Sequence, residues 1–347
     1  MAQMMKMLLV LLISLSLISV GRARDARYGT IEVDVVQLLR SGKEVSGLSK
    51  YFVDREGYRY LFSSEANRAA FKADAKRFEV QLGGACGKMG ELSGRGSVKR
   101  FAVVNGRFYV FASDGCRENF LKNPEGHLEE DAPRPTGTSD QEKLGRQLMA
   151  KAEKWSGIEA AKGRTLEVVF RSTYKSGSQE FPMALIDIFT GQSGFQAIST
   201  YYKTTYSDSI IGGDAFSIDS AGAKDPMVPA WKRSLERLRA KKIFYILTHW
   251  RDRGSLVLGH PIVNGKAKVT VHLDGVTNYI HVEATTGKIV AHEFPSRDSK
   301  GIFGLARCDF TSYSSDGGVT LPSGWTSSMN GNPQPSSNRQ GIQIRLK

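Results

Sequence analysis

The chain has 347 residues, of which 40% are hydrophobic and 24% are charged, a composition typical of a globular protein of about two domains. Lysine and arginine number 48 against 35 aspartates and glutamates, and the formal net charge of +13 makes an anionic envelope surface, of lipid or polysaccharide, a candidate partner ahead of nucleic acid. An ordinary solvated basic surface is the favoured interpretation of this charge. The sequence has no cluster of arginines and aromatic residues of the kind that reads nucleic acid, so we exclude that class of partner.

The first 23 residues predict a secretory signal peptide. An apolar run extends from Met7 to Val20, and the small residues Gly21 and Ala23 suit cleavage after Ala23. This run is shorter than the roughly 20 residues that a membrane helix needs, so an uncleaved anchor is the less favoured alternative. No other stretch is long enough to span a bilayer. We therefore expect an exported chain, periplasmic or secreted, without a transmembrane segment in its mature form.

Two stretches of the N-terminal part, Gly57–Phe71 and Gly106–Phe120, repeat one another 49 positions apart. Each predicts a glycine turn, a strand with alternating aromatic residues, and a short helix that begins after a serine. Ser64 and Ser113 are natural N-caps, and the acidic residue that follows each of them suits the positive end of the helix dipole. Each repeat is therefore predicted to be a strand, a cap and a short helix.

The two repeats resemble the YHS domain, a small treble-clef-like module whose core reads approximately Tyr-x-Phe-Cys-Ser-x-x-Cys-x-x-x-Phe. The second repeat, "YVFASDGCRENF", keeps the second cysteine as Cys116 and has Ala112 in place of the first. The first repeat, "YLFSSEANRAAF", has Ser63 and Asn67 in these places. The resemblance implies a YHS-like domain over residues 30–128, of the exported branch of that family and with an incomplete cysteine motif.

The three cysteines of the chain leave alternatives open. The YHS resemblance implies a metal site, for which Cys86, Cys116 and His127 are the candidate ligands, with Asp114 as a fourth for tetrahedral zinc. A disulfide between Cys86 and Cys116 is the favoured alternative, because it suits an exported protein and would stabilise a small domain by about 3–4 kcal/mol. Two unlinked thiols are the third alternative. Cys308 lies on a predicted strand and is expected in the core.

A linker is predicted at residues 129–140, where proline, glycine, threonine and acidic residues gather. The domain that follows, residues 141–347, opens with a polar helix at about Gln141–Lys154. Runs of period two separated by turn glycines then predict an antiparallel meander. A helix at about Val228–His249 and further strands complete an α+β order.

This C-terminal domain resembles the LolA-type carriers of periplasmic lipoproteins. The matching pieces are "YIHVEATTGKIVAHEF" and "DFTSYSSDGGVTLPSGW". The resemblance implies a curved antiparallel β-sheet with packing helices, a half-barrel. A sheet rich in aromatic residues that curls against a helix leaves an apolar concavity for an acyl chain if it does not close fully, and a filled core is the alternative, which is favoured by a narrow margin. Because the resemblance implies a carrier, the first hypothesis is a binding protein for a lipid or a lipoprotein acyl chain, and a metal-binding or metal-sensing protein is the second hypothesis.

No catalytic motif emerges from the sequence. There is no Gly-x-Ser-x-Gly elbow, "AHEF" lacks the second histidine of a zinc-protease helix, and "SGRGS" is a lone Gly-x-Gly. His272 and His281 flank a turn, and His281 shares a strand face with Tyr279 and Glu283, which predicts polar-face histidines with a metal site as the alternative. We expect a protein that is not an enzyme, with no catalytic residues and no cofactor. An enzyme of an unrecognised type is the third hypothesis.

Overall fold

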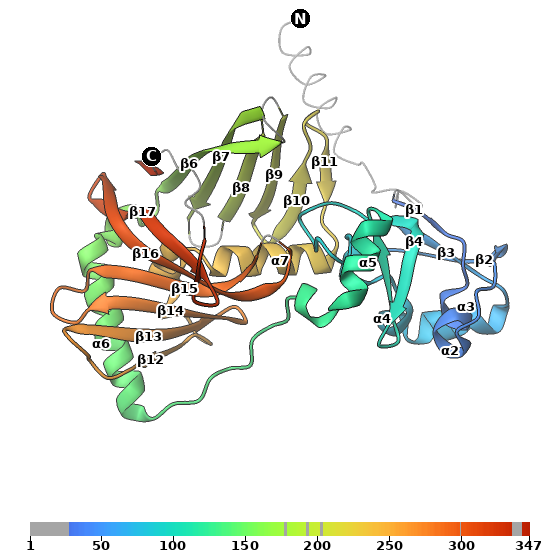
Figure 1. Ribbon diagram of the computed structural model, residues 1–347, viewed down its shortest axis with the longest axis horizontal. Helices are drawn as coiled ribbons and strands as arrows, with labels where there is room; N and C mark the ends of the chain where they lie inside the picture. The colour runs from blue at the N-terminus through green and yellow to red at the C-terminus, as the bar shows by residue number, and fades with distance from the viewer. Residues whose placement is uncertain (1–27, 177–178, 192–193, 202–203, 299, 335–341) are drawn as a thin grey trace, which may run out of the picture. The chain divides into compact units, whose positions relative to one another are not determined.

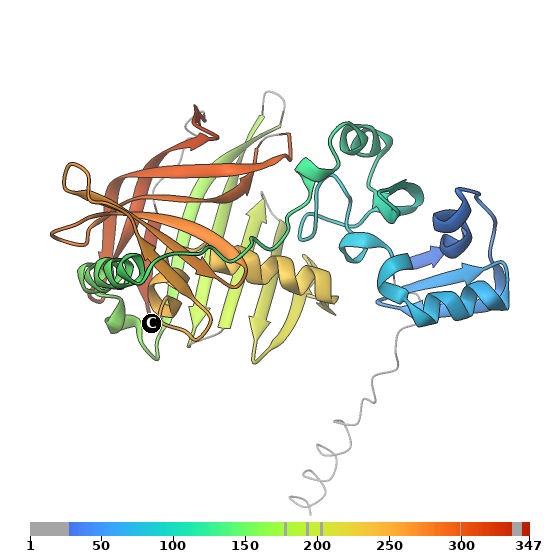
Figure 2. The same cartoon turned by 90° about the horizontal axis from the view of Figure 1, so that it is seen from below.

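The described chain forms two compact units, which are treated separately (Figures 1 and 2). The first unit holds the described residues up to Gln81 and Ser97–Val110, and the second holds Leu82–Gly96 and the described residues from Phe111 onward. The predicted signal peptide lies outside the described residues. The computed structural model describes residues 28–176, 179–191, 194–201, 204–298, 300–334 and 342–347.

The first unit is built around a sheet of order β1-β3-β2, in which β1 runs parallel and β2 antiparallel to β3. Tyr58, Tyr60 and Phe62 of β3 are each at most 1% exposed. The ring of Phe71 lies 4.6 Å from that of Tyr60 and 5.2 Å from that of Phe62, so the predicted strand, cap and helix are confirmed. The elements are β1 (Gly29–Ile31), α2 (Val35–Ser41), β2 (Leu48–Arg55), β3 (Tyr58–Phe62), α3 (Glu65–Ala73), α4 (Ala75–Phe78) and the paired strands β4 (Ser97–Val104) and β5 (Arg107–Phe111).

A buried carboxylate organises the first repeat. Asp34, the N-cap of α2, accepts hydrogen bonds from the backbone of Gln37 (3.0 Å), from the hydroxyl and backbone of Ser63 (2.6 and 2.7 Å) and from Nδ2 of Asn67 (2.7 Å). Burial alone would raise the pKa of Asp34, but these hydrogen bonds together lower it below its ordinary value. Asn67 therefore has a structural role in the first repeat that its counterpart Cys116 does not share.

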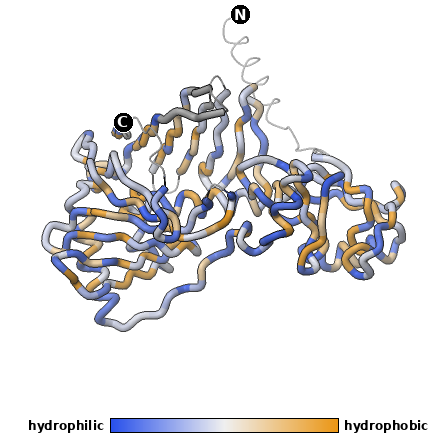
Figure 3. The backbone as a smooth tube through the Cα atoms, viewed as in Figure 1, coloured by the Kyte–Doolittle hydropathy of each residue, from blue (hydrophilic) through white to orange (hydrophobic). Residues whose placement is uncertain are grey.

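The second unit contains two seven-stranded antiparallel sheets within the described residues, with the strand orders β11-β10-β9-β8-β7-β6-β19 and β12-β13-β14-β15-β16-β17-β18. Hydrophobic and hydrophilic residues alternate along these strands (Figure 3), as expected for sheets with one face on a core. The strands are β6 (Thr165–Ser176), β7 (Gln179–Thr190), β8 (Gly194–Tyr201), β9 (Thr204–Ile211), β10 (Asp214–Ile218), β11 (Lys224–Pro226), β12 (Leu256–Gly259), β13 (Lys266–Leu273), β14 (Val276–Glu283), β15 (Ile289–Arg297), β16 (Phe303–Asp316), β17 (Val319–Met329), β18 (Asn332–Pro333) and β19 (Ile342–Leu346).

Helices complete the core of the second unit. Leu148 and Met149 of α6 and Ile246 of α8 join residues of both sheets in one hydrophobic cluster. Helix α6 packs along β12, and α7 contacts β9 (Figure 1). No helix of the described part combines the length and the apolar character that crossing a bilayer requires. The helices are α5 (Asp114–Lys122), α6 (Ser139–Ser156), α7 (Pro229–Ala240) and α8 (Ile243–His249), with the short 3-10 helices η1 (Gln81–Gly84), η2 (Glu125–His127) and η3 (Ile158–Ala161).

The architecture of mixed helices and large antiparallel sheets confirms the predicted α+β class. The single helix predicted over residues 228–249 is wrong, because Lys241 ends α7 and Lys242, in an extended conformation, precedes α8. The predicted linker has no regular secondary structure as far as residue 138. It is nevertheless fastened to α7, since the carboxylate of Asp131 lies 2.7 Å from both Arg233 and Arg237.

Two glycines allow α6 to approach β12 at backbone distance. A Cβ atom added to Gly145 would lie 2.6 Å from the backbone nitrogen of Gly259 and 2.9 Å from the carbonyl oxygen of Val257. Neither of these neighbours is the end of a flexible side chain, so neither can move away easily. The packing of α6 on the sheet therefore requires glycine at this helical position.

We predict that Gly145→Ala destabilises the second unit, although alanine is intrinsically better than glycine in a helix by about 1 kcal/mol. The clash with β12 should outweigh that gain and cost about 1–3 kcal/mol overall, measured as the free energy of unfolding in urea. Gln147→Ala, on the exposed side of the same helix, is the control and should stay within about 0.5 kcal/mol of the parent. A Gly145→Ala protein as stable as this control would contradict the close approach.

Candidate functional site: an apolar cavity between the sheets

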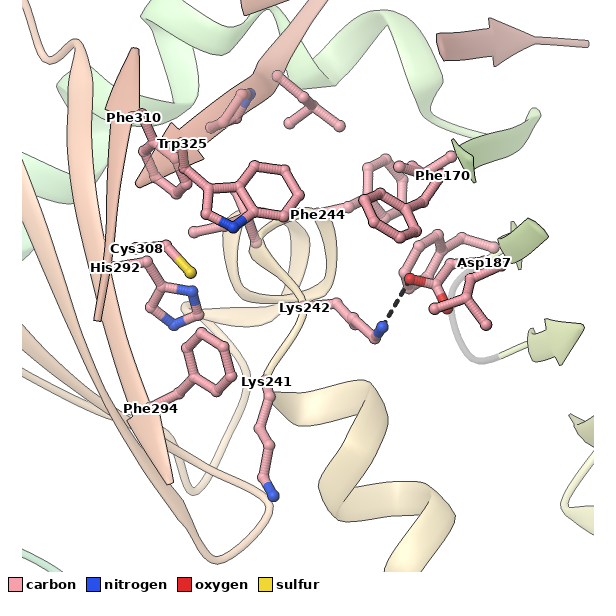
Figure 4. A pocket seen from close by; sticks show the side chains of 16 residues that line it. Phe170, Asp187, Lys241, Lys242, Phe244, His292, Phe294, Cys308, Phe310 and Trp325 are labelled. Atoms are coloured by element: carbon pink, nitrogen blue, oxygen red, sulfur yellow. Dashed lines mark ion pairs between the residues drawn. The ribbon is translucent and has the colours of Figure 1, made fainter. Parts of the chain in front are cut away.

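A cavity of about 360 Å³ lies between the two sheets of the second unit, within the range of roughly 300–1,000 Å³ typical of small-molecule sites (Figure 4). It is bounded by β6 and β7 on one side, by β15, β16 and β17 on the other, and by the junction of α7 and α8. Its lining residues are Val168, Phe170, Leu185, Asp187, Phe189, Lys241, Lys242, Ile243, Phe244, His292, Phe294, Cys308, Phe310, Leu321, Pro322 and Trp325.

Strand alternation explains which side chains reach the cavity. In β6 and β7 every second residue faces it, and the register pairs Val168 with Asp187 and Phe170 with Leu185. In the opposite sheet, His292 of β15 is the cross-strand partner of Cys308 of β16, so these two side chains share the face toward the cavity. The lining is therefore assembled from residues more than 100 positions apart.

Aromatic rings make up much of the lining (Figure 4). Phe170 of the first sheet and Trp325 of the second stack with ring centroids 6.1 Å apart and planes inclined by 28°. Phe189 and Phe244 are in tilted contact at 4.6 Å, which joins β7 to α8. Because these contacts connect the sheets and the helix directly, they define the cavity walls with large apolar surfaces.

Charged groups of the lining all lie on β7 and at the junction of α7 and α8. The ammonium of Lys242 lies 2.7 Å from Oδ2 of Asp187, and these side chains are 30% and 21% exposed. Lys241 turns instead to Glu129, and this pair is more deeply buried. Burial lowers the pKa of Lys241, Glu129 opposes that effect, and the positive charges of Arg237 and Arg297 lower the pKa further. The break in the helix thus sends two adjacent lysines to different partners.

His292 is a buried neutral histidine in the cavity wall. It is 3% exposed, and its Nε2 lies 3.0 Å from Oδ1 of Asn278, whose own amide nitrogen donates to the carbonyl of Ala240 (3.1 Å). Because Asn278 donates with its nitrogen there, its oxygen is left to accept, so Nε2 of His292 carries the proton. Burial, with a further contribution from His281, lowers the pKa of His292 to about 3.

This pKa predicts an acid-dependent loss of stability. The unfolded chain protonates His292 below its ordinary pKa of 6.5, whereas the folded protein resists protonation down to about pH 3. Stability should therefore fall as the pH decreases from 6.5 toward 3. His292→Gln, which can still donate to Asn278, should show a flatter dependence in urea unfolding measured across this range.

Burial also lowers the pKa of His260, His272 and His281, so part of the pH dependence should remain in the His292→Gln protein. The quantity to compare is therefore how steeply the free energy of unfolding falls with decreasing pH in the parent and in His292→Gln, because neither protein is expected to be independent of pH. Parallel curves for the parent and His292→Gln would show that His292 is not the buried neutral group described above.

The residues that the sequence proposed as metal ligands are not brought together. Cys86 is buried and Cys116 is half-buried, and both are free thiols, so the predicted disulfide between them is not formed. His127 is 2% exposed, its Nδ1 lies 3.0 Å from the carbonyl oxygen of Gly301, and its ring stacks on Phe120. Among the described residues no group of three or more His, Cys, Asp or Glu side chains could hold a metal ion. The metal hypothesis therefore finds no support.

The late histidines lie in ordinary polar contacts. Nδ1 of His272 is 3.0 Å from the hydroxyl of Thr277, and Nε2 of His281 is 2.9 Å from Oε1 of Glu293, which also binds Arg307. His281 lies on the less buried face of its strand as predicted, whereas His272 is only 7% exposed and is a buried polar residue. The histidine that lines the cavity is His292, for which the sequence predicted no role.

The comparisons with known proteins show only remote similarity. No protein-family model and no curated protein matches the chain, so the YHS resemblance stays a prediction. One similar solved structure is a putative outer membrane lipoprotein-sorting protein domain from Vibrio parahaemolyticus, with 10% sequence identity, a match over 60% of this chain and 92% of that chain, and a TM-score of 0.34. A LolA superfamily protein from Nitrosomonas europaea has 10% identity, a match over 58% of this chain and 92% of its own, and a TM-score of 0.37. A DUF1329 family protein from Desulfovibrio piger has 11% identity, a match over 60% of this chain and 91% of its own, and a TM-score of 0.34. TM-scores below 0.5 do not establish a shared fold, so the site is interpreted from its own geometry.

Proposed function

We propose that this protein is an exported, non-enzymatic carrier that binds an apolar ligand, the acyl chain of a lipid or a lipoprotein, in the cavity between its sheets. The observation that carries the proposal is the cavity itself. A solidly packed interior was the alternative to a carrier, and the space of about 360 Å³ argues against it. Export follows from the predicted signal peptide, and the net charge of +13 suits a protein that works beside anionic envelope lipids.

The chemistry of the walls supports an apolar ligand. Rings and aliphatic side chains supply most of the lining, and a hydrocarbon chain gains about 0.8 kcal/mol for each methylene that it removes from water. The ionisable side chains of Lys242 and Asp187 pair with each other, and His292 is held by Asn278. Groups engaged in this way favour binding over proton transfer, which supports a carrier in preference to an enzyme.

Filling part of the cavity should weaken uptake. Leu185→Trp adds a large ring at the cavity wall, and displacing even two methylenes of a bound chain should weaken binding roughly tenfold. The measurement is the fluorescence titration of the delipidated protein with a fatty acid that carries an apolar fluorophore. Unchanged folding of the variant is checked by circular dichroism and by its thermal melting curve.

Ile186→Trp is the matched control. Ile186 is the next residue of the same strand and points to the opposite face of the sheet, so the same substitution there leaves the cavity open. It should bind the probe like the parent. If the parent takes up no probe, or if Leu185→Trp and Ile186→Trp bind it equally well, the carrier proposal is wrong.

A further inference from the structure

Lys242 and Asp187 form a charged corner of the cavity, and an entirely apolar ligand would give these two side chains no role in binding. We infer that the ligand is amphipathic and that its apolar chain ends in an oxyanion, a carboxylate or a phosphate monoester, which Lys242 binds. The inference rests on the proposed function, because the chain in the cavity is what brings the head group to Lys242.

Lys242 has hydrogen-bonding capacity to spare. Its ammonium carries three N–H donors, and the contact of 2.7 Å with Asp187 engages one of them. Within the part of the chain that the structure describes, Lys242 has no second charged partner. Figure 4 shows its side chain reaching across to Asp187 on β7, so that the remaining donors lie at the cavity. Asp187 thus acts as a positioning residue that holds the ammonium in place.

The neighbouring lysine is differently placed. Lys241 and its partner Glu129 are 11% and 12% exposed, so their pair is already shielded from water. Lys242 is 30% exposed and remains accessible. A pair at this exposure contributes only about 0–1 kcal/mol, so Lys242 can readjust to an incoming anion at little cost. Lys241 therefore forms a buried ion pair with Glu129, and Lys242 is the lysine available to a ligand.

The donors of Lys242 select an anion. Lys241 is paired with Glu129, Lys242 is paired with Asp187, and His292 in the opposite wall stays neutral. A cationic head group would meet the ammonium of Lys242, the accessible one of the two, and could accept none of its hydrogen bonds. An uncharged head group, such as an ester, can accept a hydrogen bond from Lys242, but a neutral acceptor gives a bond only about half as strong as an ionised one. A carboxylate or phosphate satisfies these donors through charge-assisted hydrogen bonds.

The experiment compares four probes of equal chain length on the delipidated full chain: a fatty acid, an alkyl phosphate, the methyl ester of the acid, and an alkylammonium. Binding is measured by displacement of an uncharged apolar fluorophore. The parent should prefer the acid and the phosphate to the ester and the ammonium. Inorganic phosphate and acetate should displace nothing, which separates an anion attached to a chain from a free anion.

Lys242→Met removes the charge and keeps an apolar side chain of similar reach. It should weaken binding of the acid and the phosphate roughly ten- to hundredfold, the loss expected for a charge-assisted hydrogen bond, and change ester binding less than about threefold. Lys143→Met, at an exposed position of α6, is the control for net charge and should bind all probes like the parent. Lys242→Arg retains the charge and donors and should keep the preference for anions.

The outcomes separate the two claims. If ester and acid bind the parent equally and Lys242→Met affects neither, the head-group assignment is overturned while the carrier proposal stands. The same holds if Lys242→Met weakens both probes equally in a folded protein. If no probe binds the folded parent, both claims are overturned. A loss of anion binding in Lys242→Arg as large as in Lys242→Met would also contradict the assignment, because both variants must then act through packing.

Discussion

The site depends on the extended backbone of Lys242. With φ at −88° and ψ at 128° this residue separates α7 from α8, whereas a continuous helix would hold Lys241 and Lys242 about 100° apart around one axis. The break releases Lys241 toward Glu129 and lets Lys242 cross to Asp187. It also starts α8 at the place where Phe244 contacts Phe189, so one irregular residue fixes both the ionic corner and an aromatic wall of the cavity.

The features that could be predicted from the sequence are those that a local pattern of residues determines. Period-two runs placed the antiparallel strands, and Ser64 and Ser113 marked the helix starts, because capping and strand alternation are decided within a few residues. The break between α7 and α8 was missed because neither glycine nor proline marks it, and tertiary partners decide it instead. The sequence left a cavity and a filled core as alternatives, because the contact between Phe170 and Trp325 depends on how two sheets pack and no local rule encodes it.

The repeated frame of the N-terminal part shows how similar sequences can carry different structural tasks. Both repeats use the same serine cap, with the hydroxyl accepting from the backbone of Asn67 in one and of Cys116 in the other. The side chains diverge, because the amide of Asn67 completes the shell of hydrogen bonds around the buried Asp34, and a thiol is too weak a donor for that purpose. The difference between the repeats is therefore explained by a local requirement of the first repeat, without a metal site in the second.

In an apolar cavity with an accessible ion pair, Lys242 with Asp187, different groups determine how tightly a ligand binds and which way round it lies. Each methylene of a bound chain contributes about 0.8 kcal/mol, so a chain of several carbons supplies more binding free energy than one partly exposed ammonium can. Lys242 would then decide which end of the ligand lies at the junction of α7 and α8, and it would discriminate among ligands by their head groups. Specificity of this kind comes from the charge-assisted hydrogen bonds that an anionic head group accepts from Lys242, whereas the strength of binding comes from the rings of Phe170, Phe244 and Trp325.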